Sequence, residues 1–242
     1  MQHIFFKHMR KSQLLMLVLG LTLTVKSFAT PATDLLDKLK KTYPNIPFSH
    51  VVETPVTGIY EAGFGKDILY VEASGTYFFP TMVNMITKQN LGEDRRAELN
   101  KVNFSDLPLK DAIKVVNGDG SREMVVFSDP NCSYCKRLEQ VLSNTKDTTV
   151  YVFAVGILGE DSVKKANAIS CADGDKGKLW RSMVLEGKTI PAKSCDNSPV
   201  TRNLALFQTL GFQGTPGIVF KNGTVVKGFI DAPKIEELLA KK

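Results

Sequence analysis

The feature that most constrains the fold is a pair of cysteines, Cys132 and Cys135, placed where a predicted strand gives way to a predicted helix. The strand covers Glu123 to Phe127, and the helix has apolar residues at i, i+4, i+7 and i+8 counted from Tyr134. A buried strand over residues 149–155 follows. The order strand, helix, strand predicts a βαβ unit with the cysteine pair at the start of its helix.

This position favours redox chemistry at the cysteine pair. The thiolate is the nucleophile in disulfide exchange, and a helix N-terminus favours it through unpaired N–H groups and the positive end of the helix dipole. Lys136 and Arg137 add positive charge directly after the pair. We therefore predict Cys132 as the attacking thiol and Cys135, one turn further into the helix, as the thiol that resolves a mixed disulfide.

Two other roles for the pair stay open. A zinc site needs further ligands, but Cys171 and Cys195 stand singly, 24 residues apart, and have no histidine partners. An inert structural disulfide between the paired cysteines is the second alternative. The redox interpretation predicts no metal and no other cofactor.

The first 29 residues have the three parts of a secretory signal peptide. Lys7, Arg10 and Lys11 form a positive region, Leu14–Val25 is an apolar core of 12 residues, and Ser27-Phe28-Ala29 places small residues before a predicted cleavage after Ala29. An uncleaved membrane anchor is the alternative, although 12 apolar residues fall short of the roughly 20 needed to cross a bilayer. We expect the mature chain to be soluble in an oxidising compartment.

Charge and histidine content exclude several function classes. The formal charge is +6, but without the four basic residues of the leader 27 basic and 25 acidic side chains remain, a net charge of +2. That balance lacks the basic footprint of a nucleic-acid-binding protein. His50 is the single imidazole beyond the leader, so a site built on several histidines is excluded as well.

Cys171 and Cys195 have a different predicted role. An even number of cysteines in an exported protein favours pairing. A bridge across this loop would stabilise the fold by about 3 to 4 kcal/mol in the chain-entropy model. We interpret it as a staple for the largely helical stretch over residues 161–210. Two further redox-active thiols are the alternative, although neither cysteine lies at an evident boundary between strand and helix.

The segment before the cysteine pair has a separate pattern. Residues 33–40 predict a short helix, and residues 48–79 predict a small antiparallel sheet with a hairpin turn at Ser74-Gly75. Residues 92–99 are mostly charged, with acids in the first turn. They predict a solvated helix that connects two domains, and an ordinary surface helix is the alternative.

The rest of the chain continues the α/β pattern. A strand and a glycine-rich turn precede the βαβ unit, a strand pair follows the helical stretch, and a capped helix closes the chain. These predicted elements are the strand Ile113–Val116, the turn Asn117–Gly120, the helical break at Pro191–Pro199, the strands Gly217–Phe220 and Val225–Phe229 around Asn222-Gly223, and the helix after Asp231.

Thr215-Pro216 precedes one of these strands, and its context beside a C-x-x-C pair predicts a cis peptide bond. Because proline has no N–H, a cis proline at a strand start leaves the backbone of the preceding residue free to pair with an extended substrate. We therefore predict Thr215 and Pro216 as substrate-binding residues, together with Ser133 and Tyr134 between the cysteines.

Several motifs in this order resemble the DsbC/DsbG family of bacterial periplasmic thiol:disulfide interchange proteins, closer to DsbC than to DsbG. They run through the whole of the predicted mature chain. The motifs are Thr54-Pro55-Val56, Gly58-Ile59-Tyr60-Glu61, Ile68-Leu69-Tyr70-Val71, Phe127-Ser128-Asp129-Pro130-Asn131-Cys132-Ser133-Tyr134-Cys135, Cys171-Ala172, Pro191-Ala192, Ser194-Cys195 and Gly214-Thr215-Pro216.

The resemblance implies an α+β protein. After the signal peptide, residues 1–29, it implies a small cystatin-like N-terminal dimerisation domain over residues 30–90 and a linker helix over residues 91–104. A C-terminal thioredoxin-fold domain with a helical insertion follows over residues 105–242.

The resemblance also implies roles for single residues. Cys132 corresponds to the attacking thiol and Cys135 to its partner, whereas Cys171 and Cys195 correspond to a structural disulfide. Thr215-Pro216 corresponds to the cis-proline loop of the thioredoxin fold.

The implied partners are a second copy of the chain, misfolded or mis-oxidised exported proteins, and a membrane thiol reductant of DsbD type in the periplasm.

The leading hypothesis is a disulfide isomerase that rearranges incorrect disulfides. Ser133-Tyr134 departs from the family, because DsbC-like members carry Gly-Tyr and DsbG-like members Pro-Tyr between the cysteines. Since this dipeptide tunes the redox poise, an oxidase or reductase on the same scaffold stays open. A holdase chaperone with secondary thiol chemistry is a hypothesis from another class.

Overall fold

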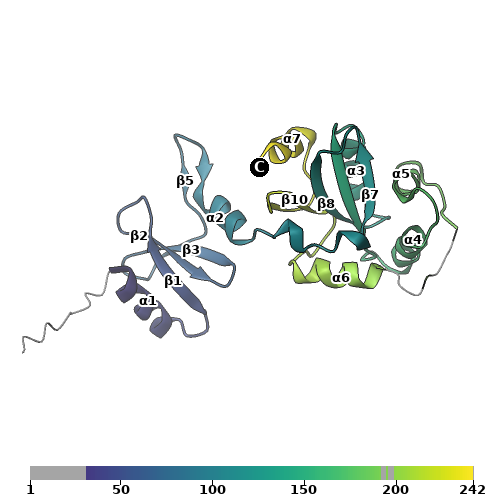
Figure 1. Cartoon of the computed structure of the whole chain (residues 1–242). Coiled ribbons are helices and arrows are strands. Elements are labelled where there is room, and N and C mark those ends of the chain that lie inside the picture. The colour runs from purple at the N-terminus through teal and green to yellow at the C-terminus, as the bar shows by residue number, and fades with distance from the viewer. Residues whose placement is uncertain (1–30, 192–194, 196–198, 242) are drawn as a thin grey trace, which may run out of the picture.

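The computed structural model describes residues 31–191, 195 and 199–241, which form two lobes (Figure 1). The predicted signal peptide and its cleavage after Ala29 lie outside the described residues, as do Ala192 and Ser194 of the family motifs. No helix in the described part of the chain is long and apolar enough to cross a membrane.

The smaller lobe is an antiparallel sheet covered by one helix, as the sequence predicts. The helix, α1 (Pro31–Thr42), buries Leu35 and Leu39, which lie on one face because they are four residues apart. They pack against Phe48, Val51 and other apolar side chains of the sheet. The sheet has the order β1-β2-β3-β4, with β1 (Phe48–Glu53), β2 (Ile59–Phe64), β3 (Asp67–Glu72) and β4 (Phe78–Phe79).

A hairpin that the sequence analysis did not predict extends from this lobe. It consists of β5 (Val83–Asn84) and β6 (Gln89–Asn90), which pair with each other and with no other described strand. Val83, Met85 and Ile86 are exposed in it. A two-stranded hairpin of this kind is marginally stable in water. These three side chains are left exposed by the described residues of the chain.

The predicted linker helix over residues 91–104 is only partly helical. α2 (Leu91–Leu99) ends before Asn100, whose side chain donates to a backbone carbonyl of the smaller lobe at 3.0 Å. The Val102 N–H then donates to the Gly223 carbonyl of the larger lobe at 3.0 Å. The helix ends early because the chain bonds to the second lobe here instead of continuing the helical hydrogen bonds.

α2 also contacts the smaller lobe more closely than a solvated helix would. Arg95 Nε donates to Glu61 Oε1 at 3.0 Å, and Arg96 Nε donates to Asp67 Oδ1 at 2.6 Å. The charged residues of α2 are the reason for predicting a solvent-exposed helix. In the structure, two of them instead attach α2 to the sheet through ion pairs.

The larger lobe contains a five-stranded sheet in the order β11-β10-β8-β9-β7. β8 and β9 are parallel and α3 joins them, which confirms the predicted βαβ unit. β10 and β11 form the predicted hairpin. The elements are β7 (Ile113–Asn117), β8 (Arg122–Ser128), α3 (Ser133–Leu142), β9 (Thr148–Ala154), β10 (Gly217–Phe220) and β11 (Val225–Lys227).

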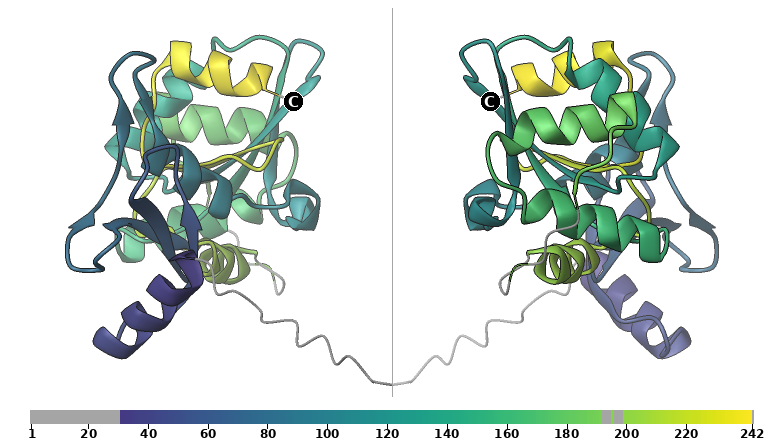
Figure 2. Two further views of the ribbon diagram at one scale, coloured as in Figure 1. Left: turned by 90° about the vertical axis from the view of Figure 1, so that its left-hand side faces the viewer. Right: turned by 90° about the vertical axis from the view of Figure 1, so that its right-hand side faces the viewer.

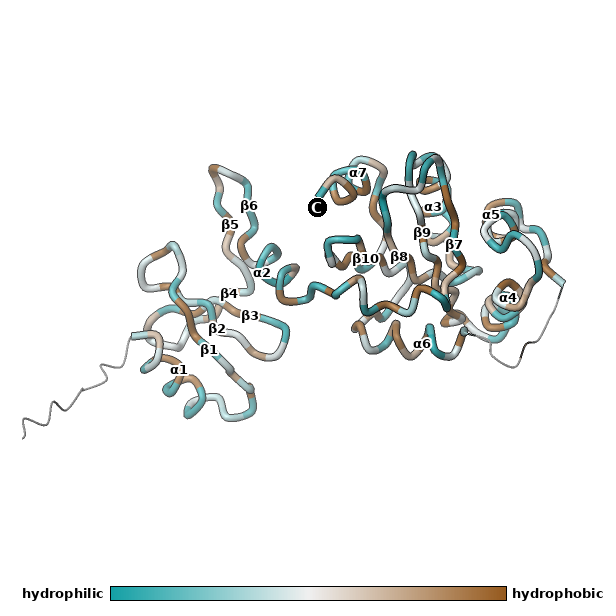
Figure 3. Tube along the Cα trace, viewed as in Figure 1, coloured by the Kyte–Doolittle hydropathy of each residue, from teal (hydrophilic) through white to brown (hydrophobic). Residues whose placement is uncertain are grey.

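Both faces of this sheet are covered. Along β8, Met124 and Val126 contribute to one hydrophobic core with α3, whereas Val125 and Phe127 contribute to another with α6. This alternation follows from the two-residue period of a strand. The central strands accordingly appear hydrophobic in Figure 3.

β7 and β8 are not paired, although only a glycine-rich turn joins them. β9 lies between them and pairs with β7 antiparallel, from Ile113 opposite Val152 to Asn117 opposite Thr148. The turn therefore connects two strands that are separated by β9 and does not form a hairpin.

The remaining helices match the predicted helical stretch and the capped C-terminus. Asp231 caps the last helix by accepting a hydrogen bond from the Lys234 N–H. This helix and α1 lie far apart in all views (Figure 2). The helices are α4 (Glu160–Ser170), α5 (Lys176–Glu186), α6 (Val200–Thr209) and α7 (Ala232–Ala240), and 3₁₀ turns cover Phe104–Asp106 and Leu109–Asp111.

Candidate active site

The two predicted redox cysteines lie at the N-terminus of α3. Cys132 caps the helix, and its Sγ accepts a hydrogen bond from the Cys135 N–H at 3.4 Å. Both cysteines are free, with Cys132 8% exposed and Cys135 2% exposed. The N-terminus of α3 thus directs a backbone N–H donor at the sulfur of the outer cysteine.

The inner cysteine has a different environment. Burial raises the pKa of the Cys135 thiol, and the nearby hydroxyl groups of Ser128 and Thr215 oppose that rise only in part. Cys135 therefore keeps its proton at neutral pH. The pair combines an outer sulfur at a helix end with an inner thiol that is protonated and shielded from solvent.

The Thr215-Pro216 loop lies directly beside Cys132. The peptide bond is cis, as predicted, and the Cys132 thiol donates to the Thr215 carbonyl at 3.4 Å. Gly217, the next residue, is paired with Phe127 near the end of β8, which holds the loop close to the start of α3. In the described part of the chain the Thr215 N–H has no hydrogen-bond partner.

The residues between the cysteines face solvent. Ser133 is exposed, and Tyr134 is 53% exposed. The Tyr134 ring lies 6.5 Å from the ring of Phe229, and the Arg137 guanidinium lies 4.8 Å from the Phe229 centroid. The structure thus adds Phe229 to the predicted surroundings of the pair.

A buried carboxylate that the sequence analysis did not single out fixes the loop before Cys132. Asp129 is fully buried and accepts hydrogen bonds from the Asn131 N–H at 2.8 Å and the Ser162 hydroxyl at 2.7 Å. Its other oxygen accepts from the backbone N–H groups of Ile157 and Leu158 at 2.8 and 3.0 Å. These bonds tie the end of β8 to the loop before α4 and so position Cys132.

A second buried carboxylate connects α3 to α5. Glu139 is 5% exposed and accepts from the Trp180 indole N–H and from Arg181 Nε, both at 3.0 Å. Because these partners are about 40 residues away in the chain, only a sequence signal such as a charged residue on the apolar face of α3 could have indicated the contact.

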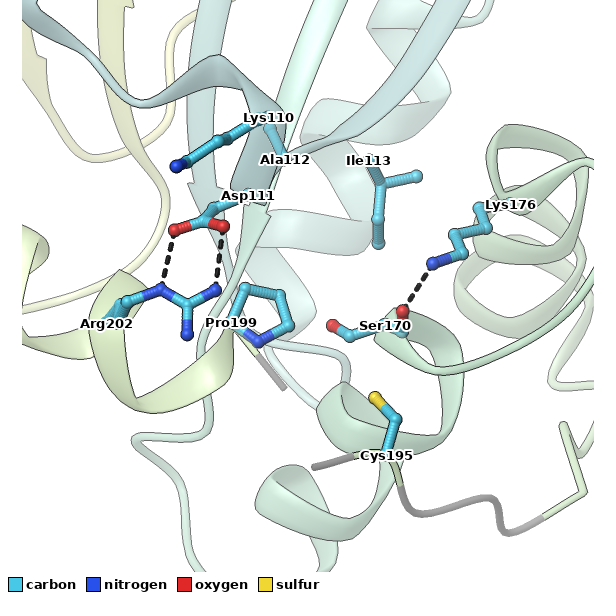
Figure 4. A pocket seen from close by; sticks show the side chains of 9 residues that line it. All are labelled: Lys110, Asp111, Ala112, Ile113, Ser170, Lys176, Cys195, Pro199 and Arg202. Carbon is cyan, nitrogen blue, oxygen red and sulfur yellow. Dashed lines mark hydrogen bonds and ion pairs between the residues drawn. The ribbon is translucent and has the colours of Figure 1, made fainter. Parts of the chain in front are cut away.

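The second cysteine pair lies elsewhere in the same lobe. Cys171 and Cys195 form a disulfide with a Cα–Cα distance of 5.7 Å, as predicted. Cys171 follows the last residue of α4, and Cys195 lines a cavity of about 250 Å³ beside the Asp111–Arg202 ion pair (Figure 4). Neither α3 nor the Thr215-Pro216 loop contributes to this cavity.

The described residues contain no group of three or more His, Cys, Asp or Glu side chains arranged to hold a metal ion. The structure brings four of the predicted site residues together, namely Cys132, Cys135, Thr215 and Pro216. Their arrangement suits attack by the outer sulfur on a disulfide, followed by resolution from an inner thiol.

Comparison with known families gives two matches along the chain. Residues 26–93 match the family described as disulfide bond isomerase protein N-terminal domain, and residues 109–242 match the thioredoxin-like domain family. Together these matches confirm the predicted fold class, with a small N-terminal domain of this type followed by a thioredoxin-like domain.

Individual proteins give the same assignment. The chain is 36% identical to the probable thiol:disulfide interchange protein DsbC of Bordetella pertussis, over 84% of this chain and 72% of that protein. It is 28% identical to thiol:disulfide interchange protein DsbC of Escherichia coli, over 80% and 82% of the two chains. The crystal structure of a disulfide interchange protein from Neisseria gonorrhoeae is 39% identical, with a TM-score of 0.53, over 56% of this chain and 97% of that one. The chain therefore belongs to the DsbC family of thiol:disulfide interchange proteins.

Proposed function

We propose that this protein is a disulfide isomerase for exported proteins, in which Cys132 is the attacking thiol and Cys135 the resolving thiol. The observation that carries the proposal is the asymmetry of the pair, with Cys132 at the helix N-terminus beside Thr215 and Cys135 buried behind it. The position at the helix N-terminus suits an attacking thiol, and the buried position suits a resolving thiol.

The reaction proceeds by two exchanges. The Cys132 thiolate attacks one sulfur of a substrate disulfide, so a mixed disulfide forms and the other substrate sulfur leaves as a thiolate. In isomerisation a substrate thiolate then attacks the mixed disulfide and releases Cys132. If Cys135 loses its proton and attacks instead, the substrate leaves reduced and a Cys132–Cys135 disulfide remains.

The surroundings of Cys132 support binding of an extended substrate chain. The Thr215 N–H, which has no partner among the described residues, offers a backbone donor. Ser133 and Tyr134 present side chains to solvent. A groove of about 370 Å³ runs beside this position, lined by Gly211, Gln213, Gly214, Thr215, Lys227 and Gly228. Pairing along a backbone edge suits substrates of many sequences, because it does not depend on side chains.

We also propose that two copies associate through residues 30–90, with residues 91–104 as the connection to a catalytic domain over residues 105–242. The smaller lobe is too small to be comfortably stable alone. Exposed apolar residues of this lobe support the proposal, among them Tyr77, Phe79, Val83, Met85 and Ile86. A second copy would cover them and add strands to the two-stranded sheet of β5 and β6.

The proposed compartment is the periplasm, which the signal-like leader supports. An isomerase acts there with a reduced Cys132, because only a free thiolate can attack a substrate disulfide. A membrane thiol reductant of DsbD type is the proposed source of electrons.

Refolding of a scrambled multi-disulfide protein such as ribonuclease tests the proposed activity. The reduced protein should restore native activity faster than dithiothreitol at the same thiol concentration, and Cys132→Ala should remove the gain. An oxidase or reductase would change the number of substrate disulfides without restoring native pairing. A holdase would suppress aggregation equally well with both Cys132 and Cys135 replaced by Ala.

The proposed dimer has its own test. Ile86→Asp places a charge at a side chain that is 93% exposed, so the fold of one chain should tolerate it. We expect sedimentation at micromolar concentration to change from dimer to monomer. Leu158→Asp, at a 56% exposed position in the larger lobe, is the control and should stay dimeric. A wild-type monomer, or a dimeric Ile86→Asp, would contradict this interface.

A further inference from the structure

We propose that Arg137 and Lys227 form a docking site for acidic side chains in the partner segment whose cysteine reacts with Cys132. This inference rests on the proposed function and adds a preference among substrates to it. It follows from where two unpaired cations lie relative to Cys132 and the Thr215-Pro216 loop.

Arg137 has a defined position without a charged partner. Its guanidinium lies 5.6 Å from the ring centroid of Tyr134 and 4.8 Å from that of Phe229. Among the described residues it forms no ion pair or hydrogen bond through its side chain. Two aromatic rings therefore hold the group in place while its N–H donors stay available to a carboxylate.

Lys227 lies beside the Thr215-Pro216 loop. It is the last residue of β11 and is paired with Gly217, the residue after Pro216. Its side chain is exposed, and it lines the groove that also includes Gly214 and Thr215. Within the described part of the chain Lys227 also lacks an acidic partner.

Acidic residues on the elements around the active site are already engaged. Asp231 accepts the N-cap hydrogen bond of α7, and Glu236 pairs with Arg122 at 2.5 Å. Asp161, on the α4 side of the active site, pairs with Lys165 at 2.7 Å. The positive charge of Arg137 and Lys227 is therefore left for a ligand.

A partner segment is the occupant that this charge pattern fits. A chain in the groove beside Thr215 would carry its cysteine at Cys132 and pass between the two cations. Carboxylates match the fork of an arginine in two parallel hydrogen bonds, and a lysine adds a compact charge. Because both cations are exposed, each contact is modest and sensitive to salt.

The step itself is unchanged by this docking. The Cys132 thiolate attacks the partner disulfide, and the partner's second sulfur leaves as a thiolate. The acidic side chains raise the rate at which the partner binds, since opposite charges steer association.

Two peptides with one disulfide each provide the test, identical except for Glu or Gln at both neighbours of the reacting cysteine. The rate of exchange with the reduced full-length protein is measured at low salt and at 0.5 M salt. We expect the Glu peptide to react about 3- to 10-fold faster at low salt, and the advantage to vanish at high salt. Arg137→Gln and Lys227→Gln should each reduce the ratio of the two rates.

The ratio separates docking from thiol reactivity, because a change at Cys132 alters both rates equally. Lys178→Gln, whose side chain is 87% exposed on α5, is the matched control and should keep the wild-type ratio. Equal rates for both peptides at low salt, or a ratio that neither variant changes, would overturn the docking site. Absence of exchange with either peptide would instead contradict the proposed function of Cys132.

Discussion

The larger lobe contains two pairs of cysteines that differ in oxidation state, in spacing along the chain and in their position relative to the helices. Cys132 and Cys135 are free, three residues apart, and lie at the start of a helix beside a cis-proline loop. Cys171 and Cys195 are joined, 24 residues apart, and connect the end of α4 to the segment before α6. Placement at a helix N-terminus favours reactivity, whereas a bridge across a long loop favours stability.

This difference predicts that replacing one pair impairs disulfide exchange, whereas replacing the other pair lowers stability. Cys132→Ser should lower the rate of disulfide exchange by more than about 100-fold, because the hydroxyl cannot form a disulfide. The free energy of unfolding of the Cys132→Ser variant should differ little from that of the wild-type protein. Insulin reduction and urea denaturation measure the two effects, and Cys132→Ser that keeps substantial turnover would contradict the assignment.

The second pair should show the opposite pattern. Replacing both Cys171 and Cys195 by Ala should lower the free energy of unfolding by about 3 to 4 kcal/mol, because the loop gains entropy in the unfolded chain. Exchange at Cys132 should persist where the protein stays folded. Urea denaturation with and without the replacement gives the stability, and loss of turnover in the folded variant would place this pair in the electron path.

A smaller effect distinguishes the two cysteines of the reactive pair. Because burial raises the pKa of Cys135, the folded protein keeps this proton at a pH where the unfolded chain, with a thiol pKa of about 8.5, loses it. The contribution of this thiol to stability is therefore complete below about pH 8.5 and declines as the pH rises towards the folded value.

Alkylation of the reduced protein checks that asymmetry. At neutral pH, iodoacetamide should modify Cys132 well before Cys135, and peptide mapping identifies the modified residue. In Cys132→Ala the rate at Cys135 should rise only at pH values above those of an ordinary thiol. Equal rates at both cysteines would show that the burial of Cys135 does not control its reactivity.

Local sequence signals are sufficient to predict many of the secondary-structure elements of this protein. The apolar run of β8, the apolar stripe of α3 and the cap at Asp231 each depend on neighbours within a few residues, and each predicted its element. The meeting of the C-x-x-C pair and Thr215-Pro216 is implied by the resemblance to the DsbC/DsbG family, because local signals do not determine that β10 pairs with β8.

The features that the sequence did not indicate depend on distant contacts. β9 separates β7 from β8 because pairing is decided by the whole sheet and not by the turn between them. Glu139 binds Trp180 and Arg181 across the boundary between two helices. The charged residues of α2 bind the smaller lobe, which periodicity alone cannot distinguish from exposure to solvent.

We infer that Cys132, and neither Cys171 nor Cys195, forms the covalent link to substrate. Cys135→Ala removes the resolving thiol, so a mixed disulfide with a scrambled protein should accumulate and can be isolated without reductant. Mass spectrometry of its peptides should find the link at Cys132, with Cys171 and Cys195 still joined to each other. A link at Cys171 or Cys195, or no covalent complex at all, would contradict the role of Cys132 as the attacking thiol.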